Sequence, residues 1–242
     1  MTSGVSMRVL LTRSRADAEV SARLLTIQGI EAVIAPLIDI SYVPGATVDL
    51  AAVQAILVTS ANGVRALSRA MQERDVPVYT VGDATARTAA ECGFTDVTSA
   101  GGDVGALAAI VRMKLDPLAG ALVHVTGSTV AGDLGIELAS FQYVVRRCQL
   151  YRVQTVDTLP ETAHSALVEG TIDSVLFYSP RTAAYFVKLV AVAGLETNCR
   201  QIVACCLSVA VAEALRALTF AEIRIAEAPN QDCLFAELIG NI

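Results

Sequence analysis

The chain has 242 residues, of which 54% are hydrophobic and 17% charged, with a formal net charge of −6. A duplex nucleic acid is normally met by a basic surface, so this acidic balance argues against nucleic-acid binding, whereas local backbone amides can still bind a small anion. The length allows one large or two small domains, and we favour two. The apolar composition, with no tryptophan, favours an α/β fold with parallel sheets buried on both faces.

The six cysteines form no CxxC pair, so we expect them to be reduced core residues of a cytosolic protein. His124 and His164 are the two histidines of the chain, and on this inventory we do not expect a metal site. The N-terminus lacks a basic and apolar leader, and apolar runs such as residues 202–211 are shorter than the roughly 20 residues that a bilayer requires. We therefore expect a cytoplasmic protein without a signal peptide or a membrane-spanning segment.

In chain order, the first half alternates apolar strands with helices. The predicted strands are residues 8–13, 30–35, 55–58, 78–81 and 96–98, and the predicted helices are residues 15–28, a helix from 61 onward, 84–92 and 104–114. Residues 37–43 alternate as an exposed strand would and end in Pro44-Gly45, which makes them a linker candidate. Residues 47–54 are predicted to be a short helix or a loop.

The second half repeats this alternation. The predicted strands are residues 122–125, 143–147, 175–178, 201–205 and 222–225, and the predicted helices are residues 133–139, 181–192, 209–218 and 231–239. A second extended, linker-like segment covers residues 148–153.

Six of the predicted strands end in a turn of small hydroxyl or glycine residues that opens a helix. We call these turns elbows, and they contain Thr12-Arg13-Ser14, Thr59-Ser60-Ala61-Asn62-Gly63, Gly82-Asp83, Thr126-Gly127-Ser128, Ser179-Pro180 and Leu207-Ser208. An elbow offers free backbone N–H groups and hydroxyls at the positive end of a helix dipole. The repeated elbows therefore predict a protein that binds carboxylates or phosphates.

The two halves of the chain match at nearly constant offsets, which indicates internal duplication. Thr12 and Ser14 precede Thr126 and Ser128 by 114 positions, and Ser60 precedes Ser179 by 119. Two similar lobes are therefore expected. The sequence leaves two arrangements open: each half folds as a contiguous lobe, or the extended segments pair as a bridge and residues 1–36 complete the C-terminal lobe.

Several separated motifs, taken with their order and spacing, resemble the uroporphyrinogen-III synthase family across nearly the whole chain. They are Leu11-Thr-Arg13, Thr59-Ser-Ala-Asn-Gly63, Val81-Gly-Asp-Ala-Thr-Ala86, Tyr151, Phe177-Tyr-Ser-Pro180 and Ala226-Glu-Ala-Pro229. The resemblance implies two α/β lobes with parallel sheets flanked by helices, joined by a two-stranded antiparallel linker. It assigns residues 1–36 and 156–242 to one discontinuous lobe, residues 46–147 to an inserted lobe, and residues 37–45 and 148–155 to the linker strands.

The resemblance also implies a lyase that cyclises hydroxymethylbilane, a linear tetrapyrrole with eight carboxylates, in a cleft between the lobes. The product is uroporphyrinogen III, formed with inversion of ring D and loss of water, for heme, cobalamin or chlorophyll biosynthesis. The reaction implied needs no cofactor and no metal. We expect a monomer that can make transient contact with the preceding pathway enzyme.

Tyr151 matches the family's catalytic tyrosine, and its phenol can donate a proton to the departing hydroxyl. The resemblance adds Thr85 to the substrate-binding residues, and position adds Arg13, Ser60, Asn62, Thr126, Gly127, Ser179 and Ser208. The alternative for each elbow hydroxyl is a helix cap, for Arg13 a surface charge, and for Tyr151 packing in the linker. The chain differs from the family pattern at Ser14, Leu207-Ser208 and Val211.

Two other functions fit parts of the pattern. A two-lobe protein that closes on a small anion without catalysis would also use repeated elbows. A doubly wound nucleotide or flavin protein fits less well, because no elbow contains the GxGxxG or GxxxxGK[ST] glycines that phosphate fingerprints require.

Overall fold

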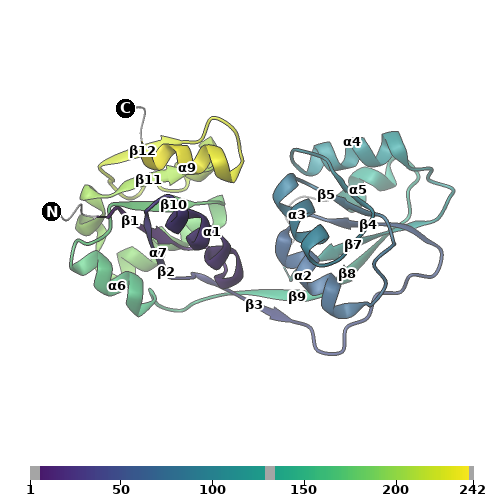
Figure 1. Cartoon of the computed structure of the whole chain (residues 1–242), viewed down its shortest axis with the longest axis horizontal. Helices are drawn as coiled ribbons and strands as arrows, with labels where there is room; N and C mark the ends of the chain where they lie inside the picture. Colours follow the sequence, from purple (N-terminus) through teal and green to yellow (C-terminus); the bar gives the residue numbers. More distant parts are fainter. Residues whose placement is uncertain (1–5, 129–133, 240–242) are drawn as a thin grey trace. The chain divides into compact units, whose positions relative to one another are not determined.

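The computed structural model describes residues 6–128 and 134–239, and the chain divides into two compact units (Figure 1). Unit 1 contains the residues up to Asp39 and those from Gln154 onward, and unit 2 contains Ile40–Val153. Each unit has a five-stranded sheet, and neighbouring strands in both sheets pair in parallel. The predicted α/β class with parallel sheets is confirmed.

The sheet of unit 1 has the strand order β12-β11-β10-β1-β2. Its strands are β1 (Arg8–Leu11), β2 (Glu31–Ile34), β10 (Ser174–Phe177), β11 (Val203–Cys206) and β12 (Glu222–Ile225). The run Val9-Leu10-Leu11 has no exposed surface, which suits a strand that is covered on both faces of a parallel sheet. β1 therefore lies between β2, its neighbour in sequence, and β10, which follows about two thirds of the chain later.

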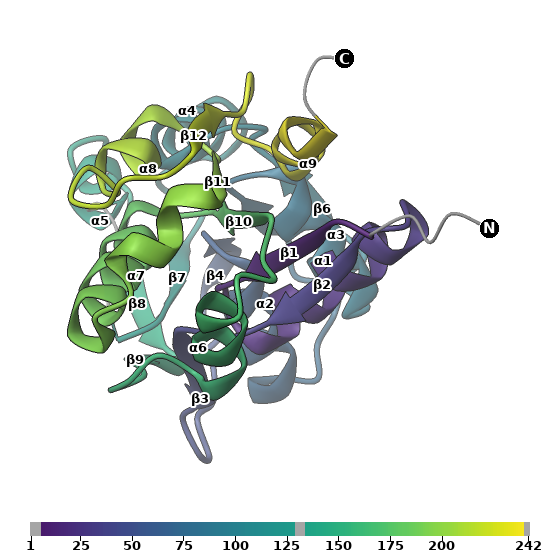
Figure 2. The same ribbon diagram turned by 90° about the vertical axis from the view of Figure 1, so that its left-hand side faces the viewer.

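Helices cover both faces of this sheet (Figure 2). They are α1 (Arg15–Ile27), α6 (Glu161–Val168), α7 (Pro180–Ala193), α8 (Val209–Glu213) and α9 (Gln231–Ile239), with the 3₁₀ helix η1 at Glu196–Gln201. α1 and α9 pack on the face that presents Val9 and Leu11. α6, α7 and α8 pack on the opposite face, against Leu10 and Phe177. Alternate residues of one strand thus serve two hydrophobic cores.

The sheet of unit 2 has the order β6-β5-β4-β7-β8. Its strands are β4 (Val53–Val58), β5 (Val78–Thr80), β6 (Val97–Ser99), β7 (Ala121–Thr126) and β8 (Val145–Gln149), and its helices are α2 (Ala61–Ala70), α3 (Asp83–Glu91), α4 (Val104–Lys114) and α5 (Leu134–Ala139). α2 and α3 pack on the face that presents Ile56 and Val58. α4 and α5 pack on the face that presents Ala55 and Leu57.

A two-stranded sheet of β3 (Ile38–Tyr42) and β9 (Tyr151–Thr155) contains both places where the chain changes unit (Figure 1). The Val43 N–H donates to the Leu150 carbonyl at 2.9 Å, and the Val156 N–H donates to the Leu37 carbonyl at 3.1 Å. The bonded positions run in opposite directions along the two strands, so the pair is antiparallel. The chain leaves unit 1 in β3 and returns to it in β9, and unit 2 is an insertion in the sequence of unit 1.

The two sheets have equivalent strand orders. β2-β1-β10-β11-β12 of unit 1 corresponds to β8-β7-β4-β5-β6 of unit 2. Residues related by the offset of 114 lie on β1 and β7, and those related by 119 lie on β10 and β4 or directly after them. Every elbow of one unit can therefore be compared with an elbow at the equivalent place in the other.

The structure differs from the sequence-based expectation in several elements. α6 and η1 were not predicted. Residues 47–52 form a loop, which was one of the two predicted alternatives, and β4 begins at Val53 rather than at Ala55. The predicted helix 209–218 ends at Glu213, since the Leu215 and Leu218 N–H groups bond to carbonyls three residues earlier, as in tight turns. α5 is described from Leu134 onward, and Asp133, where the predicted helix begins, lies outside the described residues.

Among the helices of the described residues, none is long and apolar enough to span a membrane. All six cysteines are free thiols. Burial raises the pKa of Cys205 and of Cys206 to about 12, so both remain protonated at neutral pH. These two thiols act as small core side chains rather than as nucleophiles.

Candidate active site

Tyr151 is the first residue of β9, and its side chain is held inside unit 2. The residue is 8% exposed and packs with the hydrophobic core that includes Val58 and Val125. Its Oη lies 3.0 Å from Ser60 Oγ. Ser60 is the N-cap of α2 and accepts the Gly63 N–H at 3.1 Å. The helix cap after β4 and the tyrosine hydroxyl therefore share one serine oxygen.

The elbow after β7 holds the other side of Tyr151. A Cβ on Gly127 would lie 2.6 Å from Tyr151 Cε2 and 2.8 Å from Cζ, which is closer than real Cβ contacts allow. The Leu150 N–H donates to the Thr126 carbonyl at 3.1 Å, and the Val153 N–H donates to Ser128 Oγ at 3.1 Å. Both Leu150 and Val153 are thus hydrogen-bonded to this elbow. The Tyr151 ring lies between these two contacts, against Gly127.

This arrangement fixes the position of the Tyr151 hydroxyl. A phenol carries a proton at neutral pH and can donate it only along the direction in which its ring holds the oxygen. Here the ring is fixed by the Gly127 backbone and the oxygen by Ser60. The first turn of α2 begins one residue after Ser60, so the positive end of its dipole lies near this hydroxyl pair.

The remaining predicted residues of unit 2 lie on neighbouring elements. Asn62, in the first turn of α2, accepts a hydrogen bond from Arg65 Nη1 at 2.9 Å through its Oδ1. Thr85 lies in the first turn of α3 and is 8% exposed, and Thr126 is 4% exposed at the end of β7. Thr126 contributes its backbone carbonyl to the support of β9, whereas its side chain is buried.

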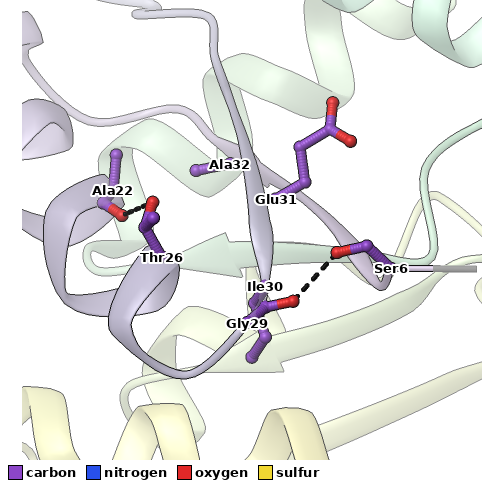
Figure 3. A pocket seen from close by; sticks show the side chains of 7 residues that line it. All are labelled: Ser6, Ala22, Thr26, Gly29, Ile30, Glu31 and Ala32. Carbon is purple, nitrogen blue, oxygen red and sulfur yellow. Dashed lines mark hydrogen bonds between the residues drawn. The ribbon is translucent and has the colours of Figure 1, made fainter. Parts of the chain in front are cut away.

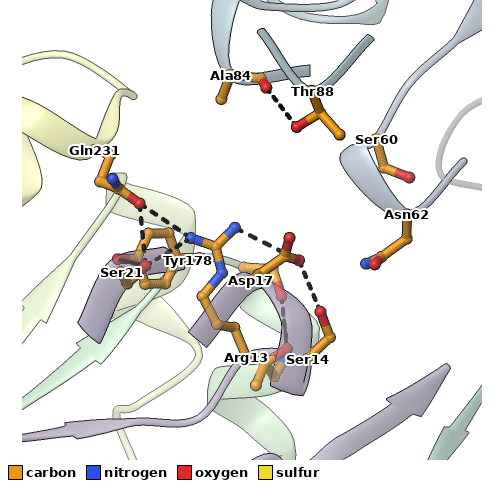
Figure 4. Close-up of polar contacts among 12 residues, drawn as sticks. Arg13, Ser14, Asp17, Ser21, Ser60, Asn62, Ala84, Thr88, Tyr178 and Gln231 are labelled. Carbon is orange, nitrogen blue, oxygen red and sulfur yellow. Dashed lines mark hydrogen bonds and ion pairs between the residues drawn. The ribbon is translucent and has the colours of Figure 1, made fainter. Parts of the chain in front are cut away.

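Arg13 forms a separate polar cluster in unit 1, which we call the arginine cluster: Arg13, Asp17, Ser21, Tyr178 and Gln231 (Figure 4). The guanidinium carbon lies 4.0 Å from the centroid of the Tyr178 ring. Nη1 donates to Ser21 Oγ and to Gln231 Oε1, both at 3.3 Å. Nη2 lies 3.7 Å from Asp17 Oδ2. The arginine therefore joins the elbow after β1 to α1, to the residue after β10 and to the start of α9.

Tyr178 is held within this cluster at both its ring and its hydroxyl. Its Oη lies 3.3 Å from Ser21 Oγ, which in turn donates to Gln231 Oε1 at 3.1 Å. Burial raises the pKa of Tyr178 above its ordinary value, while the charge of Arg13 and the hydrogen bonds of the cluster oppose that rise. Because burial dominates, Tyr178 stays a neutral phenol under a cation.

The other predicted residues of unit 1 are helix-terminal. Ser179 is the N-cap of α7 and accepts the Thr182 N–H at 3.2 Å, while its hydroxyl donates to Thr182 Oγ1 at 2.9 Å. Ser208 precedes the short helix α8 and makes no side-chain cap hydrogen bond. Val211, which differs from the family pattern, is 1% exposed and belongs to the hydrophobic core. Its apolar side chain is explained by burial.

Two other features do not form a candidate site. The described residues contain no group of three or more potential metal ligands, and His124 is buried in β7. A surface pocket of about 420 Å³ lies beside Thr26, Gly29 and Ile30 of unit 1 (Figure 3). It lies where β2 begins, whereas ligands of parallel α/β sheets bind at the carboxyl ends of the strands. The elbows, and not this pocket, lie at the carboxyl ends of the strands.

The structure thus brings together Tyr151, Ser60 and Gly127 in unit 2, and it places Arg13 in a different cluster in unit 1. The sequence did not predict that Arg13 contacts Tyr178, Ser21 and Gln231. Gln231 is 210 positions from Ser21, so only the folded sheet makes them neighbours. The motif Phe177-Tyr-Ser-Pro180 contained Tyr178, but nothing in its spacing connected this tyrosine to the elbow after β1.

A duplicated α/β fold, with a buried tyrosine hydrogen-bonded to a helix-capping serine, defines the class: a two-unit α/β protein whose polar elbows lie at the carboxyl ends of parallel strands. The family model of uroporphyrinogen-III synthase HemD matches residues 19–236. The chain therefore belongs to the uroporphyrinogen-III synthase family, and it is an enzyme of tetrapyrrole biosynthesis.

Two solved structures show the same fold. The uroporphyrinogen-III synthetase of Helicobacter pylori 26695 matches with a TM-score of 0.62 and 13% identity, over 96% of this chain and 98% of that chain. A mutant uroporphyrinogen III synthase of the extremely thermophilic bacterium Thermus thermophilus matches with a TM-score of 0.54 and 18% identity, over 97% of each chain. Among curated protein sequences, none matches significantly.

Proposed function

We propose that this enzyme closes hydroxymethylbilane to uroporphyrinogen III with inversion of ring D, and that Tyr151 is the proton donor. The observation that carries the proposal is the position of Tyr151, which has its ring against Gly127 and its Oη 3.0 Å from Ser60 Oγ. A group held at both ends in this way meets the geometric requirement of a general acid better than a mobile surface tyrosine would.

The reaction requires a proton donor and a fixed orientation of ring D, and it involves no change of oxidation state. The terminal hydroxyl leaves as water when Tyr151 protonates it, and the C–O electron pair departs with the oxygen. The azafulvene cation that remains is stabilised by the pyrrole nitrogen. Its methylene carbon is attacked by the substituted carbon of ring D, which gives a spiro intermediate. The original bond between that ring D carbon and the methylene bridge to ring C then breaks, its electron pair stays with ring D, and the second azafulvene cation so formed on ring C is attacked by the free carbon of ring D. That carbon then loses a proton, which balances the one that Tyr151 gave.

The eight substrate carboxylates need hydrogen-bond donors and positive charge. We assign these roles to Arg13, Asn62, Thr85, Ser179, Ser208 and the backbone amides of the elbows, because free N–H groups at helix starts bind anions. Arg13 is suited to a carboxylate because its guanidinium is already fixed by Tyr178 and Gln231, so little side-chain entropy is lost on binding. The free cysteines are consistent with a reducing compartment, and we place the reaction in the cytoplasm.

The identity of the product tests the function. Hydroxymethylbilane closes without a catalyst to the symmetric type I isomer, so only an enzyme that turns ring D over gives type III. The wild-type protein, supplied with fresh hydroxymethylbilane at neutral pH without metal or nucleotide, should give type III, and a chelator should not change the result. If stoichiometric protein leaves the product as type I, the chain is instead a protein that binds the anion without catalysis.

The proton-donor role is tested by Tyr151→Phe, which keeps the ring and removes only the hydroxyl. We expect turnover to fall roughly 10- to 1,000-fold, within or below the range for removing a positioned general acid, with the fold intact. The lower end of this range corresponds to a water molecule that takes the place of the phenol. Full activity at matched stability would show that Tyr151 serves only packing.

A further inference from the structure

The cap of α2 uses only part of the hydrogen-bonding capacity of Ser60. A serine hydroxyl has one proton to donate and two lone pairs to accept with. One lone pair of Ser60 Oγ accepts the Gly63 N–H at 3.1 Å, which caps α2. The second polar contact of Oγ is Tyr151 Oη at 3.0 Å. The cap bond fixes the serine oxygen, and the serine proton is directed at the tyrosine when Tyr151 needs a donor.

The equivalent serine of unit 1 shows why this proton is available. Ser179 caps α7 in the same way, at 119 positions from Ser60, but its hydroxyl donates to Thr182 Oγ1 at 2.9 Å. The residue at the place of Thr182 in unit 2 is Gly63, which has no side chain. A Cβ on Gly63 would lie 2.9 Å from Val58 Cγ1, so the packing also disfavours a threonine there. The glycine leaves the Ser60 proton without this local acceptor.

We propose that Ser60 is a positioning residue for Tyr151, an inference that rests on the proton-donor role of Tyr151 proposed above. When Tyr151 gives its proton to the departing hydroxyl, the O–H electron pair stays on Oη. The Ser60 O–H bond remains intact and its hydrogen turns toward Oη, which then carries negative charge. A hydrogen bond to a charged oxygen is roughly twice as strong as a neutral one, so Ser60 stabilises the transition state more than the ground state.

The contacts of the Tyr151 ring support the same role. The Gly127 backbone lies against the ring, and the Val153 N–H is bonded to Ser128 Oγ at 3.1 Å. Both contacts limit movement of β9 at this point. The phenol oxygen therefore stays within hydrogen-bond distance of Ser60 through proton transfer, and no reorganisation is needed as charge develops.

The test compares Ser60→Ala, Ser60→Thr, Tyr151→Phe and the double variant Ser60→Ala/Tyr151→Phe, with kcat and KM measured on hydroxymethylbilane. We expect Ser60→Ala to lower kcat by about 10- to 100-fold, the range for one hydrogen bond to a charged group, with KM within about two-fold of wild type. Ser60→Thr keeps the hydroxyl and should retain kcat within about three-fold. The double variant should be no slower than Tyr151→Phe alone, because Ser60 has no developing charge to stabilise once the phenol is gone.

Asp103→Ala is the control for the loss of a helix cap, because it removes a cap in the same unit and leaves the hydrogen donated by Ser60 in place. Asp103 caps α4 of the same unit by accepting the Ala106 N–H at 2.9 Å, and its removal costs a cap without touching Tyr151. Asp103→Ala and Ser60→Ala should lower the urea midpoint by similar amounts, while only Ser60→Ala should lower kcat.

Two results would overturn the inference alone. A rise in KM at unchanged kcat in Ser60→Ala would mean that Ser60 binds the substrate directly. Losses that multiply in the double variant would mean that Ser60 and Tyr151 act independently. Full activity of Tyr151→Phe would overturn the proton-donor role and this inference with it, and a type I product from the wild-type protein would overturn the proposed function itself.

Discussion

The elbow Thr126-Gly127-Ser128 begins at the last residue of β7 in unit 2, and Thr12-Arg13-Ser14 follows β1 in unit 1 at the offset of 114. Both threonines are buried, at 4% and 1% exposure. Each threonine carbonyl accepts the N–H of a leucine that precedes a linker strand, Leu150 at 3.1 Å and Leu37 at 3.0 Å. The backbone of the two elbows is thus used in the same way.

The middle residue of the elbow determines what lies beside it. Gly127 leaves space for the ring of Tyr151, which comes from β9. Arg13 at the equivalent place covers the ring of Tyr178 with its guanidinium, at 4.0 Å. The residue that follows Leu37 in β3 is Ile38, whereas the residue that follows Leu150 in β9 is Tyr151. One elbow supports the tyrosine that we propose as the proton donor, and the other carries a fixed positive charge.

Among the substitutions that test the difference between the two elbows, Gly127→Ala should have the largest effect on activity. The added Cβ would meet the Tyr151 ring at 2.6 Å, so the ring must shift away from the elbow and carry Oη from its position beside Ser60. We expect kcat to fall about 100-fold, the order of magnitude for a misplacement near 1 Å, and stability to fall by about 1–3 kcal/mol from overpacking. The measurements are steady-state kinetics and urea unfolding.

Gly82→Ala is the matched control. Gly82 lies at the elbow after β5 in the same unit, has φ −151°, and the nearest atom to an added Cβ is the Gly102 carbonyl oxygen at 3.8 Å. Its kcat should stay close to that of the wild-type protein, and its urea midpoint should fall only by the amount expected when alanine replaces an N-cap glycine. Equal losses in both glycine variants would show that the Tyr151 contact is not the cause.

Substitutions of Tyr178 should have a smaller effect, and that effect should be on stability rather than on kcat. Tyr178→Leu removes the ring beneath the guanidinium and should lower stability by about 2 kcal/mol, through lost burial and a lost cation–π contact. Tyr178→Phe keeps the ring and should lower it by about 1 kcal/mol, since the hydroxyl contacts with Ser21 and Arg13 are lost. Both variants should keep kcat, in contrast to Tyr151→Phe, and Tyr178→Leu should raise KM because Arg13 loses the ring that fixes its guanidinium. A fall in kcat in Tyr178→Phe with unchanged stability would identify Tyr178 as the acid instead.

The smallest effect is a pH dependence. Burial raises the pKa of Tyr178 in the folded protein, so the folded state keeps its proton where the unfolded chain, with a pKa near 10, begins to lose it. The stability contributed by the neutral phenol is complete below about pH 10 and declines as pH rises toward the folded pKa. The urea midpoint should therefore fall less steeply above pH 10 in Tyr178→Phe than in the wild-type protein. Identical slopes would contradict a raised pKa.

Sequence reasoning captured the fold because its signals are local and repeated. Apolar runs such as Val9–Leu11, and the glycine and hydroxyl turns after them, depend on nearest neighbours, and nearly every strand was placed within two residues. α6 was missed because it is short, with Pro160 at its N-cap in place of a capping side chain. The residues of the elbows could be named, but their roles could not, because those roles depend on contacts between distant segments. Ser60 meets Tyr151 across 91 positions, and Arg13 meets Gln231 across 218.

The pairing of β1 with both β2 and β10 has a consequence for synthesis on the ribosome. Val9 pairs with Ser174, 165 positions later, so at roughly 5–20 residues per second β1 waits about 10 to 30 s for its second neighbour. During that interval all strands of unit 2 emerge, between Val53 and Gln149, and can form their sheet. The apolar edge of Val9, Leu10 and Leu11 meanwhile stays open, as an edge to which another chain can add. A released fragment that ends near residue 160 should accordingly resist protease across unit 2 and be cut within the first 39 residues, and unit 1 is the last to be completed.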